Sequence, residues 1–199
     1  MADPRSALIQ SGLAVHRHEV AGLRIGELTG CRITSLRWPL KAQPTDLPSD
    51  WPMRVGDVGR HGAPVLCLRP DEWLLVETGP ALGAEPPAEI PGLLASDRSH
   101  ALALLRLDGL AAPWLQAKLG SLDFRNASDA HCAQTRLAQL RVIVHGHRPV
   151  PGGDYAWDLL VERSLARHLF ERLLEAAPHA IELSGNHSLA QAASGGREG

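Results

Sequence analysis

The sequence has few of the features that mark a secreted, disulfide-bonded or membrane-embedded protein. Its 199 residues include three cysteines, Cys31, Cys67 and Cys132, which are widely spaced and form no Cys-x-x-Cys pair. No apolar run approaches the roughly 20 residues that a membrane-spanning helix needs, and the first residues lack the apolar stretch of a secretory signal. Sparse, unpaired cysteines suit a reducing compartment. We therefore expect a cytoplasmic protein with free thiols and no membrane partner.

Lysine is also scarce, since only two of the 20 basic residues are lysines and the rest are arginines. The formal net charge is −2, and the basic residues form no continuous block. This balance argues against a nucleic-acid or anionic-membrane partner held by bulk electrostatics. Arginine is favoured over lysine at protein interfaces and in ion pairs, so the composition favours a protein partner.

Several motifs of self-contained enzymes are absent. No Gly-x-Gly-x-x-Gly follows a predicted strand, and neither Gly-Lys-Ser/Thr nor Gly-x-Ser-x-Gly occurs. The glycine-rich stretch 56–62 lacks both the dinucleotide spacing and a following apolar helix. These absences favour a binding or assembly role over a stand-alone enzyme.

The clearest secondary-structure signals lie between residues 97 and 184. Short apolar runs bounded by turn residues indicate strands, and apolar residues at three- and four-residue spacing indicate helices. The expected order is βαββαβ, with strands at 101–107, 135–144, 155–161 and 181–183 and helices at 110–119 and 164–177. Pro178 is expected to end the second helix. This order is typical of a ferredoxin-like, split βαβ unit.

The first half of the chain gives weaker signals of the same kind. Strands are predicted at 23–28, 31–36, 65–68 and 73–77, and a short helix near 93–94. The whole chain is predicted to be α+β: two small ferredoxin-like or split βαβ units, each an antiparallel sheet with helices on one face. The predicted boundaries are an N-terminal unit at 15–96, a second unit at 97–184 and a disordered, Ser/Gly-rich tail at 185–199.

Histidines and one cysteine are the candidates for metal or nucleophilic chemistry. His16-x-His18 and His145-x-His147 each place two imidazoles on one face of an extended chain, a spacing that can bind zinc. Neither pair has a visible third ligand, so surface histidines are the favoured interpretation. Cys132 follows His131, but neighbouring strand side chains point to opposite faces, which favours a buried thiol over a nucleophile.

Two tryptophans lie in a proline-rich loop at 38–53. Trp38 and Trp51 each directly precede a proline, which favours extended backbone. Large aromatic side chains on such a loop either pin it to the protein's own core or offer it to a partner. Trp38 and Trp51 are therefore the candidate partner-interface residues.

Four stretches, in order, give the chain a resemblance to one family. They are RPDEWLLV at 69–76, SHALALLRLDGLAA at 99–112, CAQT at 132–135 and WDLLVERSLA at 157–166. Over roughly residues 60–178 the chain resembles the gamma subunit of heterotetrameric sarcosine oxidase. That family is related in fold to the folate-binding aminomethyltransferase T-protein.

The resemblance implies an accessory role in a larger complex. The complex oxidatively demethylates sarcosine to glycine and passes the one-carbon unit to tetrahydrofolate. FAD, FMN, NAD, tetrahydrofolate and zinc are implied for the complex, with none of them on this chain, and the partner is the larger flavoprotein alpha subunit. The expected catalytic, cofactor-binding and metal-binding residues of this chain are accordingly none.

Three other interpretations stay open on the sequence. The chain could serve a related N-methyl amino acid dehydrogenase. It could be a stand-alone folate-binding module, for which Asp71, Glu72 and Asp108 are the candidate pterin-binding carboxylates. It could also be a metal-dependent hydrolase built on the His-x-His pairs.

Overall fold

A six-stranded antiparallel sheet forms the centre of the molecule. The computed structural model describes residues 6–10, 17–38, 47–79, 90, 92–123, 131–147 and 156–195, without the side chains of 9–10 and 188–195. In spatial order the strands of this sheet are β1 (Arg17–Val20), β2 (Leu23–Leu28), β8 (Leu102–Asp108), β11 (Ala156–Glu162), β10 (Leu140–His147) and β9 (His131–Leu137). All neighbours are antiparallel. The central strand β8 thus pairs with β2 from the first half of the chain and with β11 from the second.

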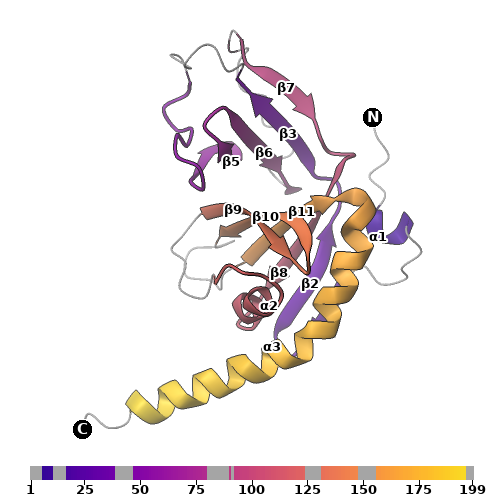
Figure 1. Cartoon of the computed structure of the whole chain (residues 1–199), viewed down its shortest axis with the longest axis vertical. Helices are drawn as coiled ribbons and strands as arrows, with labels where there is room; N and C mark the ends of the chain where they lie inside the picture. Colours follow the sequence, from indigo (N-terminus) through magenta and orange to yellow (C-terminus); the bar gives the residue numbers. More distant parts are fainter. Residues whose placement is uncertain are drawn as a thin grey trace.

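A second, five-stranded antiparallel sheet stacks on the first (Figure 1). Its strands are, in spatial order, β4 (Val58–His61), β5 (Ala63–Arg69), β6 (Glu72–Glu77), β3 (Arg32–Arg37) and β7 (Leu94–Asp97). An antiparallel bridge between Asp57 and His131 links the two sheets at one edge.

Helices cover the other face of the six-stranded sheet. These are the short α1 (Ala7–Gln10), α2 (Ala112–Leu119) and α3 (Ala166–Gly195), the last preceded by a 3₁₀ turn at Arg163–Leu165. Pro113 stands in the first turn of α2, where its missing N–H costs little. No helix within the described residues is both long enough and apolar enough to cross a bilayer.

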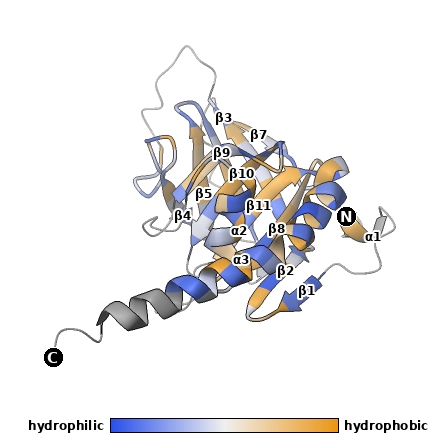
Figure 2. Ribbon diagram, turned by 60° about the horizontal axis from the view of Figure 1, so that its bottom comes forward, coloured by the Kyte–Doolittle hydropathy of each residue, from blue (hydrophilic) through white to orange (hydrophobic). Residues whose placement is uncertain are grey.

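The interior consists of three hydrophobic layers. The first lies between the helices and the six-stranded sheet, the second between the two sheets, and the third on the outer face of the five-stranded sheet. Figure 2 shows hydrophobic residues concentrated in β8, β10 and β11, the strands at the middle of this stack. Representative side chains are Leu105, Leu159 and Phe170 in the first layer, Leu66, Leu104 and Leu160 in the second, and Trp51, Val65 and Trp73 in the third.

The α+β class with antiparallel sheets and helices is confirmed. The strands predicted at 23–28, 65–68, 73–77, 101–107 and 155–161 all form, as does the helix at 110–119, with shifts of one or two residues at their ends. Gly120 ends α2 as expected, and its N–H donates to the Gln116 carbonyl.

Four details of the predicted order are wrong. The single strand expected at 135–144 is two strands, β9 and β10, separated by a tight turn at Ala138 and Gln139. Residues 181–183 are helical, because α3 continues through Pro178, and the tail expected to be disordered from 185 is helical as far as Gly195. The helix expected near 93–94 is the start of β7.

The predicted boundary between 96 and 97 does not separate the two sheets. β2 of the first predicted unit pairs with β8 of the second. The first unit thus supplies β1 and β2 to the six-stranded sheet and, apart from Asp97 of β7, the whole five-stranded sheet, so the second unit has no complete sheet of its own.

Gly109 gives a test of this interlocking. It follows β8 with a φ of +108°, and a Cβ there would lie 2.0 Å from the Gly22 carbonyl oxygen in the β1–β2 turn. The Gly109→Ala variant should lower the melting temperature by roughly 4–10 °C, because the backbone is strained for any L residue and the β1–β2 hairpin must move.

Gly185→Ala is the matched control. Gly185 lies in α3 with nothing within 4 Å of a built Cβ, so alanine should raise stability by up to about 1 kcal/mol. Equal melting temperatures for the two variants, measured by circular dichroism, would contradict this description of the β8 end.

Candidate functional site

The two tryptophans proposed as a partner surface are buried in the chain's own core. Trp38 and Trp51 expose 8% and 5% of their surface and belong to the outer layer of the five-stranded sheet. The Trp51 ring lies 5.6 Å from that of Trp73 and 6.5 Å from that of His61. Trp51 therefore pins the 47–53 segment to the sheet, and Trp38 packs in the same layer, as the interpretation in which the loop is held to the chain's own core expects.

The principal cluster of polar side chains lies between the two sheets. On three neighbouring strands, Arg106 of β8 stands opposite Asp158 of β11, and Asp158 stands opposite His145 of β10. Residues directly opposite on antiparallel strands share a face. His147 follows two residues later on β10, on that same face. The register thus brings a cation, a carboxylate and two imidazoles together.

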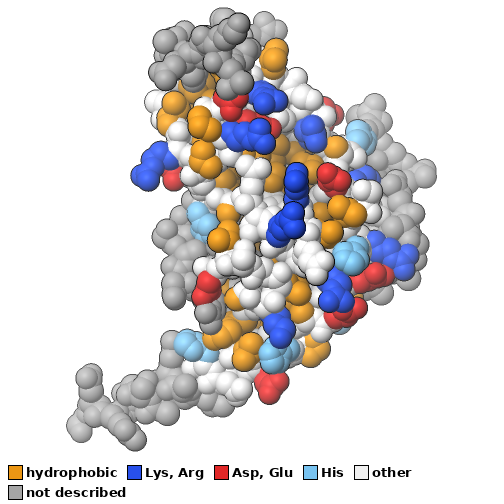
Figure 3. Space-filling model, in the orientation of Figure 1, with side chains coloured by type: hydrophobic (Ala, Val, Ile, Leu, Met, Phe, Trp, Pro, Cys, Tyr) orange, Lys and Arg blue, Asp and Glu red, His pale blue; other side chains and the backbone are white. Residues whose placement is uncertain are grey.

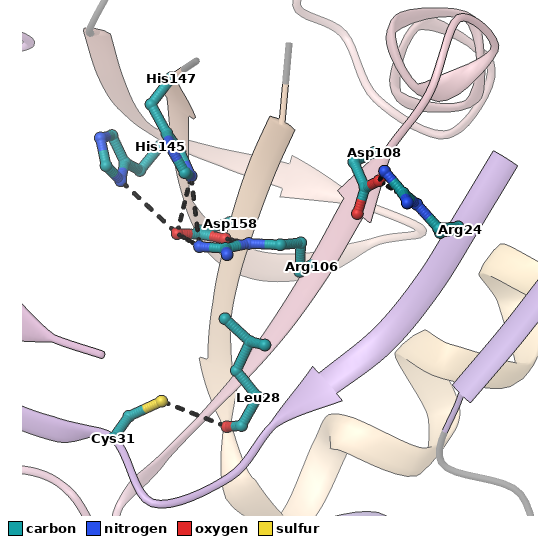
Figure 4. Close-up of polar contacts among 8 residues, drawn as sticks. All are labelled: Arg24, Leu28, Cys31, Arg106, Asp108, His145, His147 and Asp158. Carbon is teal, nitrogen blue, oxygen red and sulfur yellow. Dashed lines mark hydrogen bonds and ion pairs between the residues drawn. The ribbon is translucent and has the colours of Figure 1, made fainter. Parts of the chain in front are cut away.

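The side chains converge on the Asp158 carboxylate (Figure 4). Arg106 donates from Nε to Oδ1 at 2.7 Å and from Nη2 to Oδ2 at 2.9 Å. His147 Nε2 lies 3.0 Å from Oδ2, and His145 Nδ1 lies 3.8 Å from it, beyond hydrogen-bonding distance. The two imidazoles stack with centroids 4.7 Å apart. Because an ionised carboxylate only accepts hydrogen bonds, His147 Nε2 carries its proton toward Asp158.

Burial and charge determine the ionisation of this cluster. Burial alone would raise the pKa of Asp158, but hydrogen bonds from His147 and Arg106 and the Arg106 charge outweigh it and lower the pKa to about 2. Burial lowers the pKa of His145 to about 4, despite the neighbouring carboxylate. At neutral pH the cluster is therefore an Arg⁺–Asp⁻ pair beside a neutral His145.

His145, His147 and Asp158 are the group with metal-ligand chemistry, since their ligand atoms all lie within 4.8 Å of one another. Two histidines and a carboxylate suit zinc. However, Arg106 occupies both carboxylate oxygens, and its Nη2 lies 3.4 Å from His147 Nε2. A dication would have to displace that guanidinium and the His147 proton, so this arrangement fits an ion-pair network better than a metal centre.

The other His-x-His pair is not part of this cluster. His18 lies on β1, at the opposite edge of the sheet from β9 and β10. His16 is outside the described residues.

The cysteines do not form a nucleophilic site. Cys132 is buried between the sheets, and its Sγ lies 3.6 Å from the Asp57 carbonyl and 3.7 Å from that of Cys67. Burial raises the pKa of Cys132 to about 12 and that of Cys31 to about 11, and it also raises the pKa of Cys67. A thiolate is the reactive form, so these thiols are inert at neutral pH, in agreement with the buried interpretation of Cys132.

The three carboxylates considered for a pterin do not come together. Asp71 and Glu72 lie at the β5–β6 turn of one sheet, whereas Asp108 ends β8 of the other. Each is near an arginine: Asp71 lies 4.0 Å from Arg37, Glu72 lies 3.5 Å from Arg69, and Asp108 pairs with Arg24 (Figure 4). They therefore serve separate ion pairs on two sheets.

The sequence interpretation overlooked Arg106 and Asp158. Both are charged residues within otherwise apolar strands, Leu-Leu-Arg-Leu-Asp and Trp-Asp-Leu-Leu. A charge inside a strand that is buried on both faces needs a partner of opposite sign. One charged residue inside each of two apolar strands was therefore the sequence feature that could have identified this cluster.

Removing Arg106 should cost the protein about 3 kcal/mol of unfolding free energy, because it leaves the Asp158 carboxylate buried without its main partner. The double variant Arg106→Met/Asp158→Leu should recover most of that loss, since no charge stays buried. Arg167→Ala, which breaks a half-exposed pair with Glu171, is the control and should cost no more than about 0.5 kcal/mol. Urea denaturation measures all three; similar losses for Arg106→Ala and Arg167→Ala would contradict this interpretation.

Stability should also fall as the pH drops from about 6.5 to about 4. In the unfolded chain His145 takes up a proton near its ordinary pKa of 6.5, whereas the folded chain resists protonation until about pH 4, so acid favours unfolding. The full effect is about 3 kcal/mol. In urea titrations across this range His145→Leu should show a shallower decline than the wild type, while His179→Gln, on the exposed side of α3, should follow the wild type. If the unfolding free energy falls equally with pH in the wild type and in both variants, His145 is not the source of the acid sensitivity.

Comparison with known proteins identifies the fold. No protein-family model and no curated protein matches the chain. A solved structure, heterotetrameric sarcosine oxidase from Corynebacterium sp. U-96 in complex with pyrrole 2-carboxylate, contains a similar chain. The two chains superimpose with a TM-score of 0.66 and 24% identity, covering 89% of this chain and 96% of the other. This protein therefore has the fold of a chain of a heterotetrameric oxidase, over nearly the full length of both.

Proposed function

We propose that this chain is the gamma subunit of a heterotetrameric enzyme of the sarcosine oxidase type. In this proposal the complex demethylates sarcosine oxidatively to glycine and passes the one-carbon unit to tetrahydrofolate. The chain is an accessory, non-redox component packed on a larger flavoprotein alpha subunit. FAD, FMN, NAD, tetrahydrofolate and zinc belong to the other subunits.

The extent of the fold agreement carries the proposal. A small domain shared between otherwise unrelated proteins would match a fraction of each chain, whereas here the superposition covers 89% of this chain and 96% of the other. The matched chain is itself a component of a hetero-oligomeric oxidase. The four sequence stretches that resemble the gamma subunit lie in β6, β8 with α2, β9 and β11 with α3, which are the framework of the fold.

The chemistry of the described polar groups also supports an accessory role. Asp158 is held by Arg106 and His147, the thiols are protonated, and the partly buried carboxylates considered above pair with arginines. These groups are engaged in holding the fold together. A chain of this kind contributes surface and shape to an assembly.

Co-expression with the large flavoprotein subunit of a sarcosine oxidase tests the proposal. The chain should elute with that subunit on size exclusion, in a peak that carries flavin absorbance, and the assembled complex should oxidise sarcosine whereas the chain alone should not. Assays with other N-methyl amino acids distinguish sarcosine oxidase from a related dehydrogenase.

Calorimetry of the isolated chain with tetrahydrofolate is the companion measurement. No heat is expected, because the proposal places the folate on another subunit. Saturable binding by the isolated chain, together with failure to associate with any large flavoprotein subunit, would instead favour the stand-alone folate-binding module.

A further inference from the structure

An open groove of about 500 Å³ lies at one end of the layer between the two sheets. Its floor is apolar and includes Leu102, Ile143 and Leu160, which continue the hydrophobic layer between the sheets. Its rim is charged, with Arg98, Arg136, Arg141 and Glu162, all exposed. The groove is separate from the Arg106–Asp158 cluster, because none of the cluster residues lines it.

Two of the rim arginines are held side by side. Arg136 of β9 stands directly opposite Arg141 of β10, across the hairpin that turns at Ala138 and Gln139. Like charges directly opposite each other on neighbouring strands repel and destabilise a sheet. The pair is therefore a local cost to the isolated chain.

The positive charge of the rim arginines is not balanced within the described part of the chain. None of Arg98, Arg136 and Arg141 forms an ion pair with a carboxylate there, in contrast to Arg24, Arg32, Arg37, Arg69, Arg106, Arg167 and Arg172. Space-filling Figure 3 shows Lys and Arg side chains in the middle of the face that carries β9, β10 and β11. Three arginines against one glutamate leave this rim positive in a chain whose net charge is −2.

We propose that this groove binds an acidic segment of the partner polypeptide. Arginine forks bind carboxylates in bidentate fashion, and arginine is enriched among the residues that dominate interface energies. The groove crosses β8, β11, β10 and β9, which spans about 14 Å at the usual strand spacing. That length exceeds a small anion and accommodates about four residues of extended chain, whose apolar side chains can pack on the leucine and isoleucine floor. Naming the large subunit as the source of the segment rests on the proposed function.

The test uses the co-expressed complex and the variant Arg136→Glu/Arg141→Glu. This variant keeps two like charges opposite each other, so its folding should match the wild type, but it repels an acidic segment. Binding to the large subunit should weaken by at least about tenfold at low salt, and the fall of wild-type affinity with added salt should be largely lost. The control is Arg167→Glu/Arg172→Glu on the exposed side of α3, which should leave affinity and salt dependence unchanged.

A single variant separates binding from stability. Arg141→Glu creates an opposite-charge pair with Arg136, so it should raise the melting temperature by about 1–2 °C while still weakening the complex several-fold. A variant that loses binding because it is poorly folded would show the opposite change in melting temperature. A higher melting temperature together with weaker binding to the large subunit would thus support the proposal that the rim arginines serve a partner.

A synthetic peptide probe keeps this test separate from that of the proposed function. The probe is a labelled peptide of alternating glutamate and leucine, with citrate as a small-anion competitor. If the large subunit binds the wild type and the double variant equally, the groove proposal fails and the accessory-subunit proposal stands. If no large subunit binds but the wild type takes the peptide and the double variant does not, the proposed function fails and the groove stands. A chain that binds neither, or that binds citrate as tightly as the peptide, overturns the proposal for this groove.

Discussion

The burial of the six-stranded sheet on both faces is the constraint on which the rest of the structure depends. One face packs against α2 and α3, and the other packs against the five-stranded sheet. Strands in such a sheet must be apolar on both sides, which is why β8 and β11 read as nearly continuous runs of Leu, Ala and Val. Any charged side chain in them has to be neutralised locally, because unpaired burial of a charge is costly. Arg106 and Asp158 meet this requirement by standing opposite each other in the register.

The same constraint explains which elements could be predicted from the sequence. Buried strands bounded by turn residues, such as β5 and β6 around Pro70, are set by local signals. The β9–β10 hairpin was missed because its turn has no glycine or asparagine: Ala138 and Gln139 adopt φ values of +49° and +67°. Tertiary packing on both sides of the turn imposes a conformation that its sequence does not favour.

The end of helix α3 was predicted wrongly for a different reason. Pro178 predicts an end to the helix, although the apolar spacing continues beyond it. A proline inside a helix removes a hydrogen bond and usually ends or kinks it. Yet the apolar spacing of Phe170 and Leu173 continues through Ala177 and Ala180, and all four are buried in the layer under the sheet. Packing of this stripe against the sheet outweighs the local cost of Pro178, and the periodicity beyond the proline was the evidence that deserved more weight.

Only the two histidines of the polar cluster could be identified from the sequence. The His145-x-His147 spacing showed that two imidazoles share a face. Their partners lie on other strands: Asp158 is 11 residues after His147 and Arg106 is 41 residues before it. Which residues stand opposite each other depends on strand order and register, and these depend on the whole fold. The electrostatics of His145 follow from that same register, because burial and the neighbouring carboxylate act on it only once the strands are paired.

The treatment of charge differs between the two ends of the layer between the sheets. At one end, Arg106 and Asp158 form a neutral pair within the chain. At the other end, where the groove opens, Arg136 faces Arg141 across the hairpin, and neither forms an ion pair with a carboxylate of the described residues. A fold that neutralises its buried charge so closely has no stability reason to keep two repelling charges at the mouth of the same layer. The difference is explained if the open end is completed by another polypeptide, so that the unneutralised rim and the proposed accessory role have one cause.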